Sequence, residues 1–192
     1  MAITKEAIVK AALDILNREG IANLTMRTLA KELNIKAASL YWHIKNKQDL
    51  YNLIAEHITQ EISLPEKVDD PKEALTFIAM EFRRALLKTR DSTEIFARSV
   101  PITLNRTKII KFALNALSRY GVSDKNCVTA GNLLNNYVLS FVADEIRTRH
   151  TSPEEAKQLE QLWGEQYVLN MDFEEQFLYG LKVLLAGLQQ IK

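Results

Sequence analysis

Apolar residues recur along this chain at the three- to four-residue spacing of amphipathic helices. The first stripe consists of Ile8, Ala12, Ile15 and Leu16. It stops at Gly20, and glycine is the usual residue just after a helix because it readily adopts a left-handed backbone. The 192 residues include only six glycines and four prolines. Together these features predict an all-α fold with little strand.

The same spacing predicts more helices farther along the chain. A long one is expected from about Lys47 to Ile62, capped by Asn46 and ending before Pro65. Later helices are expected after Asp70, after Asp91, over about 105–120 and 124–148, and after Ser152 and Asp172. The segment 63–70 is therefore the expected seam between two domains.

Residues 25–47 carry two short helical patterns separated by one tight turn. Thr25 is a good N-cap for the first helix. The apolar residues of that helix that share one face are Met26, Leu29, Ala30 and Leu33. Asn34 tolerates a left-handed backbone, and Ile35 after it can fix the turn to the core. This pattern is typical of a helix-turn-helix unit.

The second short helix, beginning near Ala37, is too polar and aromatic to be core. Only Leu40 and Ile44 are expected to point inward. The remaining residues, which face outward or flank the core, are Ala37, Ala38, Ser39, Tyr41, Trp42 and His43. A DNA major groove explains them, since it admits one helix and offers thymine methyls and polar base edges. The alternative is two ordinary short helices with Tyr41 and Trp42 partly buried.

The excess of basic over acidic residues is confined to the segment that carries this motif. Residues 1–50 have a net charge of +3, whereas the whole chain has +1. Lys36, Lys45 and Lys47 bracket the second short helix. The excess is modest, so one copy would hold DNA weakly, and pairing of two copies is expected.

Two segments have the apolar character of a dimer interface. The helix over 124–148 is apolar around most of its circumference, and the last helix combines an apolar face with two glycines seven residues apart. The expected interface residues are Leu134, Val138, Phe141, Phe177, Gly180, Leu181, Leu184, Gly187 and Leu188. A larger core within a single chain is the alternative.

The region after residue 65 has more aromatic surface than a small helical core requires, which favours a ligand pocket over an enzyme site. The expected lining includes Phe77, Ile78, Phe82, Phe96, Pro101, Ile109, Phe112, Trp163 and Tyr167, with Asn136 as a polar anchor. Each of these residues taken alone is more typical of packing than of a pocket.

The motifs of common enzyme sites do not occur in this sequence. The three histidines stand at no metal-ligand spacing, and there is no nucleophile elbow or phosphate loop. Cys127 is the only cysteine and is expected to pack in a helix. We therefore expect no enzyme, no metal and no cofactor. The sequence also shows no membrane span or export signal, so we expect a cytoplasmic protein.

Several runs of residues resemble a known family. Thr25–Ala30 and Leu40–Lys47 strongly resemble the N-terminal domain of the TetR family of transcriptional regulators, closest to the tetracycline repressor subgroup. Glu81–Asp91 and Phe177–Leu181 continue the likeness. The resemblance implies a three-helix DNA-binding domain at 1–47, a connecting helix at 48–64 and a ligand-binding and dimerisation domain at 65–192.

The resemblance also implies individual contacts to double-stranded DNA. Base or near-base contacts are implied for Arg27, Ala37, Ala38, Ser39, Tyr41 and His43, and phosphate contacts for Thr25, Trp42 and Lys47. Lys36 is added as a flanking basic residue. Family members often have Gln or Glu and Pro where Lys36, Ala37 and Ala38 stand, so the operator can differ from the best-known one.

The likeness weakens where tetracycline repressors hold their drug. The position of their magnesium-binding histidine is occupied here by Phe96, which cannot ligate a metal. Other positions at which those repressors make polar contacts to the drug are occupied here by Ile78, Val100 and Asn136. We therefore expect a small, largely apolar, metal-free effector. The expected protein is a homodimeric repressor that binds a near-palindromic operator and is released by this effector. An activator or a ligand-independent adaptor of the same fold is the alternative.

Overall fold

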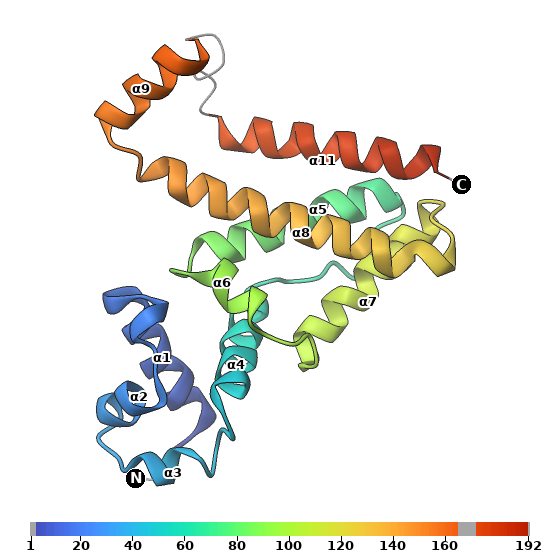
Figure 1. Cartoon of the computed structure of the whole chain (residues 1–192). Helices are drawn as coiled ribbons and strands as arrows, with labels where there is room; N and C mark the ends of the chain where they lie inside the picture. The colour runs from blue at the N-terminus through green and yellow to red at the C-terminus, as the bar shows by residue number, and fades with distance from the viewer. Residues whose placement is uncertain (1–2, 165–171, 192) are drawn as a thin grey trace.

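The computed structural model describes residues 3–164 and 172–191, and within these ranges the chain is helical, with no strand. The all-α prediction is confirmed (Figure 1). The helices are α1 (Lys5–Glu19), the 3-10 turn η1 (Ile21–Asn23), α2 (Met26–Glu32), α3 (Ala37–Leu40), α4 (Lys47–Gln60), α5 (Pro71–Leu87), α6 (Ser92–Ala97), α7 (Leu104–Arg119), α8 (Asp124–Arg149), α9 (Pro153–Trp163) and α11 (Phe173–Gln190).

Helices α1, α2 and α3 form a small head at the N-terminal end of the molecule (Figure 1). The apolar stripe predicted for α1 is buried, and α1 is followed by Gly20, whose φ of 80° is in the left-handed region. Leu40 and Ile44 also lie in the core, as their spacing predicts. The head is thus held together by local amphipathic packing.

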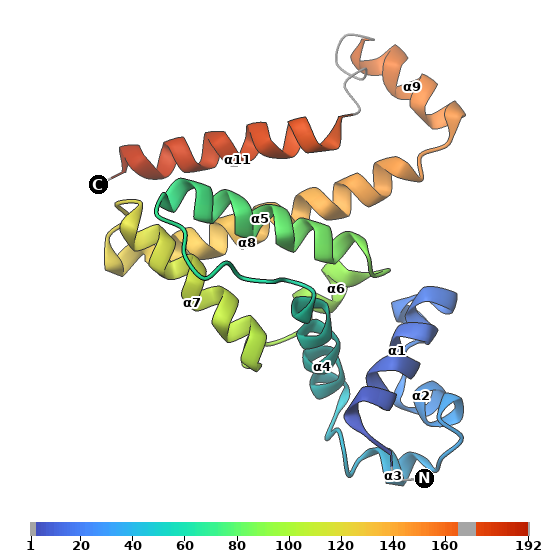
Figure 2. The same cartoon turned by 180° about the vertical axis from the view of Figure 1, so that it is seen from behind.

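The larger body is built around α8, which packs against α5, α7 and α11. Helix α11 runs alongside α8 in both views of the chain (Figures 1 and 2). Helix α9 extends beyond the end of α8. No helix among the described residues is long and apolar enough to cross a membrane.

Helix α4 connects the head to the body and contacts α1 on one side and α6 and α7 on the other. It begins at the Asn46 cap, as expected, where the Asn46 side chain accepts the Asp49 backbone N–H at 2.9 Å. It ends at Gln60, two residues earlier than expected. Figure 2 shows the non-helical segment after it crossing the body toward α5, and the Arg119 guanidinium donates to the backbone oxygens of Val68 and Asp69 in that segment.

Candidate functional site

Helix α2 is fixed at its start by a reciprocal capping box. The Thr28 backbone N–H donates to Thr25 Oγ1 at 3.1 Å, and the Thr25 backbone N–H donates to Thr28 Oγ1 at 2.9 Å. The predicted N-cap at Thr25 is therefore confirmed. These bonds fix the orientation of the Thr25 side chain at the start of α2.

The turn between α2 and α3 has the geometry that its sequence predicts. Asn34 has a φ of 53°, in the left-handed region. The Ile35 N–H donates to the Ala30 carbonyl and the Asn34 N–H to the Lys31 carbonyl, both at 3.0 Å. This is a Schellman motif, which satisfies carbonyls that the end of α2 would otherwise leave unpaired. The turn thereby sets the direction in which α3 leaves.

Helix α3 and the turn after it present aromatic side chains to solvent. Trp42 is 89% exposed and Tyr41 is 51% exposed, while Leu40 beside them is fully buried. The alternative in which both side chains are partly buried does not hold for Trp42, whereas Tyr41 is about half covered. Exposed aromatic residues beside an anchored short helix form a surface suited to contact a partner.

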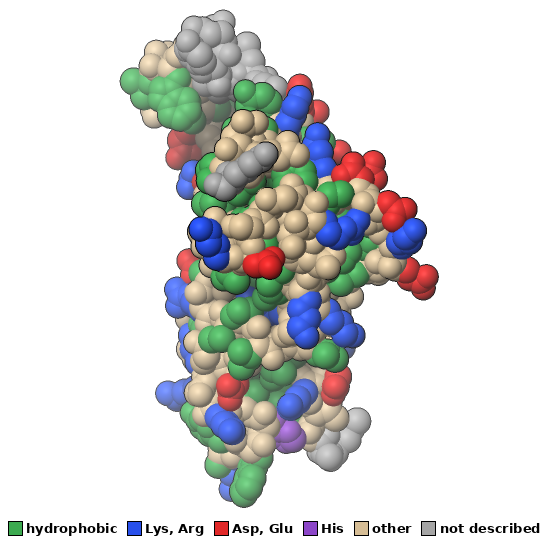
Figure 3. All heavy atoms as spheres, turned by 90° about the vertical axis from the view of Figure 1, so that its right-hand side faces the viewer, with side chains coloured by type: hydrophobic (Ala, Val, Ile, Leu, Met, Phe, Trp, Pro, Cys, Tyr) green, Lys and Arg blue, Asp and Glu red, His purple; other side chains and the backbone are tan. Residues whose placement is uncertain are grey.

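The other residues expected to contact DNA lie on the same head. Arg27, Lys36, Ala37 and Ala38 are exposed, and Thr25, Ser39, His43 and Lys47 are half-buried. Figure 3 shows basic, hydrophobic and histidine side chains together at the end of the molecule formed by the head. Behind them, Asp49 Oδ2 accepts the Lys45 backbone N–H at 3.0 Å, which fixes the start of α4 against the segment that follows α3.

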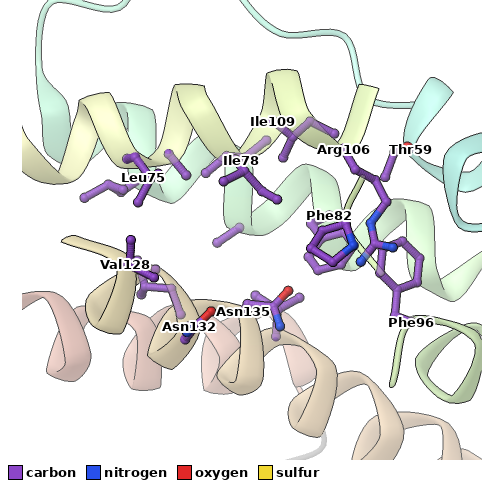
Figure 4. A pocket seen from close by; sticks show the side chains of 18 of the residues that line it. Thr59, Leu75, Ile78, Phe82, Phe96, Arg106, Ile109, Val128, Asn132 and Asn135 are labelled. Atoms are coloured by element: carbon purple, nitrogen blue, oxygen red, sulfur yellow. The ribbon is translucent and has the colours of Figure 1, made fainter. Parts of the chain in front are cut away.

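A cavity of about 350 Å³ opens in the body between α5, α7 and α8 (Figure 4). Five of the residues expected to line a pocket do so, namely Ile78, Phe82, Phe96, Pro101 and Ile109. The remaining described lining residues are Thr59, Leu75, Ala79, Ser99, Arg106, Ile110, Ala113, Leu114, Val128, Gly131, Asn132, Leu134, Asn135 and Val138. The wall is therefore mainly apolar with a few polar groups, the usual composition of a small-molecule site.

The other expected lining residues require correction. Phe77, Val100, Phe112, Asn136 and Trp163 are not among the described residues of the cavity wall, and Tyr167 lies outside the described residues. Successive residues on a helix point about 100° apart, so Ile78 lines the cavity without Phe77, and Asn135 lines it in place of Asn136. Trp163 is 62% exposed on α9.

Sequence reasoning missed Arg106, Asn132 and Asn135, the strongest polar groups of the wall. A signal was available in the helical spacing. On α7 the lining residues Arg106, Ile109, Ile110 and Ala113 share one face, and on α8 Val128, Gly131, Asn132 and Asn135 do so. A prediction based on aromatic residues does not find these two stripes, because each stripe mixes polar with apolar side chains and neither contains an aromatic residue.

Arg106 extends into the cavity from the first turn of α7 (Figure 4). Its Nη1 donates to Ser99 Oγ at 2.7 Å, and its guanidinium lies 4.9 Å from the centre of the Phe96 ring. Burial lowers the pKa of the Arg106 guanidinium, and the Glu56 carboxylate partly offsets this. A guanidinium nevertheless stays charged in proteins. The cavity wall therefore carries a positive charge.

Helix α4 is hydrogen-bonded to the segment that forms this wall. The Glu56 carboxylate accepts the backbone N–H of Asn105 at 2.9 and 3.1 Å and that of Arg106 at 3.4 Å. Asn52 Oδ1 accepts the Val100 N–H at 2.7 Å, and Gln48 donates to the Arg98 carbonyl. One face of α4 thus touches the cavity wall, and the start of α4 adjoins the exposed surface of the head.

The face expected to form a dimer also needs correction. Leu134, Val138, Phe177 and Leu181 are buried within the single chain, because α5, α8 and α11 pack together there. Of the other expected residues, Phe141, Gly180, Leu184 and Leu188 are half-buried, and Gly187 is exposed. The large apolar side chains that remain exposed on α8 and α11 are Val128, Leu133, Leu178, Tyr179 and Val183.

Comparison with known proteins accounts for both parts of the molecule. Residues 8–54 match the family model of bacterial regulatory proteins of the tetR family, and residues 64–191 match that of the tetracyclin repressor-like C-terminal domain. The tetracycline repressor protein class D of Escherichia coli is 31% identical over an alignment of 198 positions, which covers 97% of this chain and 89% of that protein.

Solved structures agree over nearly the full chain. ActR from Streptomyces coelicolor in complex with actinorhodin aligns with a TM-score of 0.85 and 28% identity, covering 98% of this chain and 96% of ActR. Mycobacterium smegmatis BioQ aligns with a TM-score of 0.78 and 32% identity, covering 99% of each chain. BioQ bound to its double-stranded DNA operator also matches. The chain belongs to the TetR family of DNA-binding transcriptional regulators.

Proposed function

We propose that this TetR-family chain is a ligand-responsive repressor that binds a near-palindromic operator as a homodimer and is released by a small, largely apolar effector. The observation that carries the proposal is the set of hydrogen bonds from α4 to the segment that forms the cavity wall. ActR bound to actinorhodin and BioQ bound to its operator support a ligand site and a DNA site on one such fold.

The DNA contacts belong to the exposed surface of the head. The backbone geometry of α2, the turn and α3 is that of a unit whose second helix enters the major groove. Arg27, Tyr41 and His43 are suited to base edges, and Ala37 and Ala38 to thymine methyls. Trp42, Lys47 and Thr25 are suited to the phosphate backbone, with Lys36 adding positive charge.

The homodimer rests on the exposed apolar surface of α8 and α11. Tyr179, Val183 and Gly187 follow one another at four-residue spacing, so they share one face of α11. A twofold dimer would use this face twice and would present two heads to half-sites about 34 Å apart on one side of the duplex. A near-palindromic operator follows from that symmetry.

Release follows if the effector binds one arrangement of α4 better than the other. A ligand in the cavity touches the α6–α7 segment, and Glu56 and Asn52 carry any displacement of that segment to α4. Coupling of this kind requires only a difference in ligand affinity between the two arrangements. An activator with the same fold is a second candidate, because the sign of regulation depends on where the operator lies.

DNA binding is tested by electrophoretic mobility shift with the DNA that flanks the chain's own gene. We expect specific binding by the wild type, loss with Arg27→Ala and with Tyr41→Ala, and no change with the control Arg147→Ala, an exposed arginine on α8. Specific binding that survives both head substitutions would refute the assignment of the reading surface. A shift of equal strength with random DNA would refute sequence-specific recognition.

Assembly is tested separately by sedimentation equilibrium. Val183→Asp places a charge on the exposed apolar face of α11 and should dissociate the dimer, whereas Lys182→Asp, next to it on the chain, should leave the dimer intact. A monomeric wild type, or a dimer indifferent to Val183→Asp, would contradict the proposed interface. An effector that strengthens operator binding would instead contradict release and favour the activator.

A further inference from the structure

Arg106 is the charged side chain of the cavity wall; the other described lining residues are apolar or uncharged. The Ser99 hydroxyl and the Phe96 ring, which contact its guanidinium, carry no negative charge. Among the residues that the structure describes, no carboxylate lies within ion-pair distance of this guanidinium. The guanidinium has five N–H donors, so donors remain available to a ligand.

Glu56 is the acid that interacts electrostatically with Arg106, but its oxygens are engaged elsewhere. They accept the backbone N–H groups of Asn105 and Arg106 at the start of α7. The negative charge of Glu56 therefore compensates the partial positive charge at the N-terminus of α7 and is shared between that helix end and the Arg106 guanidinium. A partly buried cation with so little compensation favours binding of an anion, since the anion replaces solvation that burial removed.

The rest of the wall is suited to a flat, unsaturated body. The Phe82 and Phe96 rings meet edge to face with centroids 5.0 Å apart. Figure 4 shows Arg106 beside these rings and shows Asn132 and Asn135 on the opposite wall. A cavity of about 350 Å³ holds a ligand of two or three fused rings. The amides of α8 can bind neutral oxygens at the far end of such a ligand.

We infer that the effector is a planar aromatic monocarboxylate, held by a carboxylate–guanidinium pair at Arg106 with its rings against Phe82 and Phe96. The inference rests on the proposed role of the cavity as the effector site. The planar fork of a guanidinium matches the two oxygens of a carboxylate. One cation matches a single negative charge, whereas a phosphate dianion would require more donors.

This placement also connects the charge of the ligand to the DNA-reading head. A carboxylate at Arg106 competes with Ser99 Oγ for the same guanidinium. Ser99 precedes Val100, whose backbone N–H donates to Asn52 on α4. The charged group of the effector therefore acts at the point where the cavity wall is hydrogen-bonded to α4, and a neutral ligand of the same shape lacks this effect.

Two probes of equal shape test the inference: anthracene-9-carboxylate and neutral anthracene-9-methanol, titrated by fluorescence into the full-length chain. We expect the carboxylate to bind wild type about tenfold or more tightly than the alcohol. Arg106→Gln should remove the preference and leave the affinity for the alcohol unchanged. Arg106→Lys should keep part of the preference. Lys111→Gln removes an exposed cation of the same helix outside the cavity wall and should change neither affinity.

The outcomes separate this inference from the proposed function. Equal affinity of wild type for both probes would overturn the charge preference and leave the cavity as an effector site. Loss of the preference in Lys111→Gln would also overturn it, since general attraction of anions would then explain the data. Binding of neither probe would overturn the inference and leave the operator and dimer tests of the proposed function unaffected. Circular dichroism confirms folding, and if Arg106→Gln unfolds, the reduced preference of folded Arg106→Lys decides the matter.

Discussion

The carboxylate of Asp91 accepts the backbone N–H of Ile21 at 2.7 Å, which joins the start of η1 to the start of α6 across 70 positions of sequence. Asp91 has a φ of 54°, in the left-handed region that aspartate and asparagine tolerate better than most residues. Beside it, the Arg90 guanidinium donates to the Asn17 carbonyl at 3.1 Å. The head is therefore attached to the body at a second point besides α4.

Asp91→Ala should lower the free energy of unfolding by about 1–3 kcal/mol, because the Ile21 amide loses its partner and alanine resists a left-handed backbone. Asp91→Asn keeps an acceptor and the tolerated conformation, so its loss should be smaller. Urea unfolding followed by circular dichroism measures both. Equal losses in the two variants would show that the hydrogen bond and the backbone conformation contribute nothing specific.

Leu40 and Trp42 lie two positions apart and should respond in opposite ways. Leu40→Ala empties a fully buried site and should cost about 2–5 kcal/mol of stability. Trp42→Ala changes an exposed side chain and should alter stability by less than about 0.5 kcal/mol while weakening DNA binding. Thermal unfolding and mobility shift, performed on both variants, would contradict this assignment if Trp42→Ala destabilised the fold.

The head could be predicted from sequence because its determinants are local. Thr25 caps α2 through a residue three positions away, and Asn34 makes its turn within five residues. Leu40 and Ile44 are the large aliphatic residues of this short segment, and their four-residue spacing places both on its inner face. In each case the partner lies within one or two helical turns, where spacing alone determines the contact.

The cavity and the dimer face could not be predicted in the same way because they depend on helix rotation. Asn135 lines the cavity and Asn136 does not, although the two are adjacent and chemically identical. Likewise, Val138 has the apolar character of an interface residue but is covered by its own chain. Periodicity shows that a face is apolar; it does not show which neighbour covers that face.

A buried ion pair connects α5 to α8. Arg83 Nε and Nη2 donate to the two oxygens of Glu145 at 2.8 and 2.9 Å, and Arg149 donates to the same carboxylate at 2.6 Å. Glu145→Gln should destabilise the chain by about 3–5 kcal/mol, because it leaves a buried guanidinium without its counter-charge. The double variant Arg83→Met with Glu145→Gln should recover part of this loss in urea unfolding. No recovery would argue against a specific pair.

Gly180 and Gly187 offer a matched comparison on α11. A Cβ at Gly180 would lie 2.4 Å from Tyr137 Oη, whereas a Cβ at Gly187 meets nothing within 4 Å of it in the chain. The Tyr137 ring is stacked on Phe177 and its hydroxyl donates to the Phe177 carbonyl at 2.7 Å, so it has little freedom to move. Gly180→Ala should therefore cost about 1–3 kcal/mol in urea unfolding.

Gly187→Ala should leave the folded core unaffected and weaken the dimer, if a partner helix approaches closely at that position. Sedimentation equilibrium measures the dimer constant, and circular dichroism during urea titration checks the core. Unchanged dimerisation would place the partner elsewhere on α11.

Glu56 should determine how firmly α4 is attached to the cavity wall. Its carboxylate accepts two backbone N–H groups at the start of α7, from Asn105 and Arg106. Glu56→Ala removes the acceptor for both, and loss of a helix cap of this kind costs about 1 kcal/mol. The amides of Asn105 and Arg106 should then exchange with deuterium several-fold faster, as measured by mass spectrometry of the peptides that span the start of α7.

The matched control for this variant is Glu61→Ala, at the far end of α4. Glu61 pairs with Lys88 on the surface, and exposed pairs of this kind contribute little stability. Its loss should leave exchange at the start of α7 unchanged. If both variants accelerate exchange at Asn105 equally, the effect comes from general loosening of α4. If neither does, α7 is held by its own packing, and the route from the cavity to the head passes instead through Asn52 and Val100.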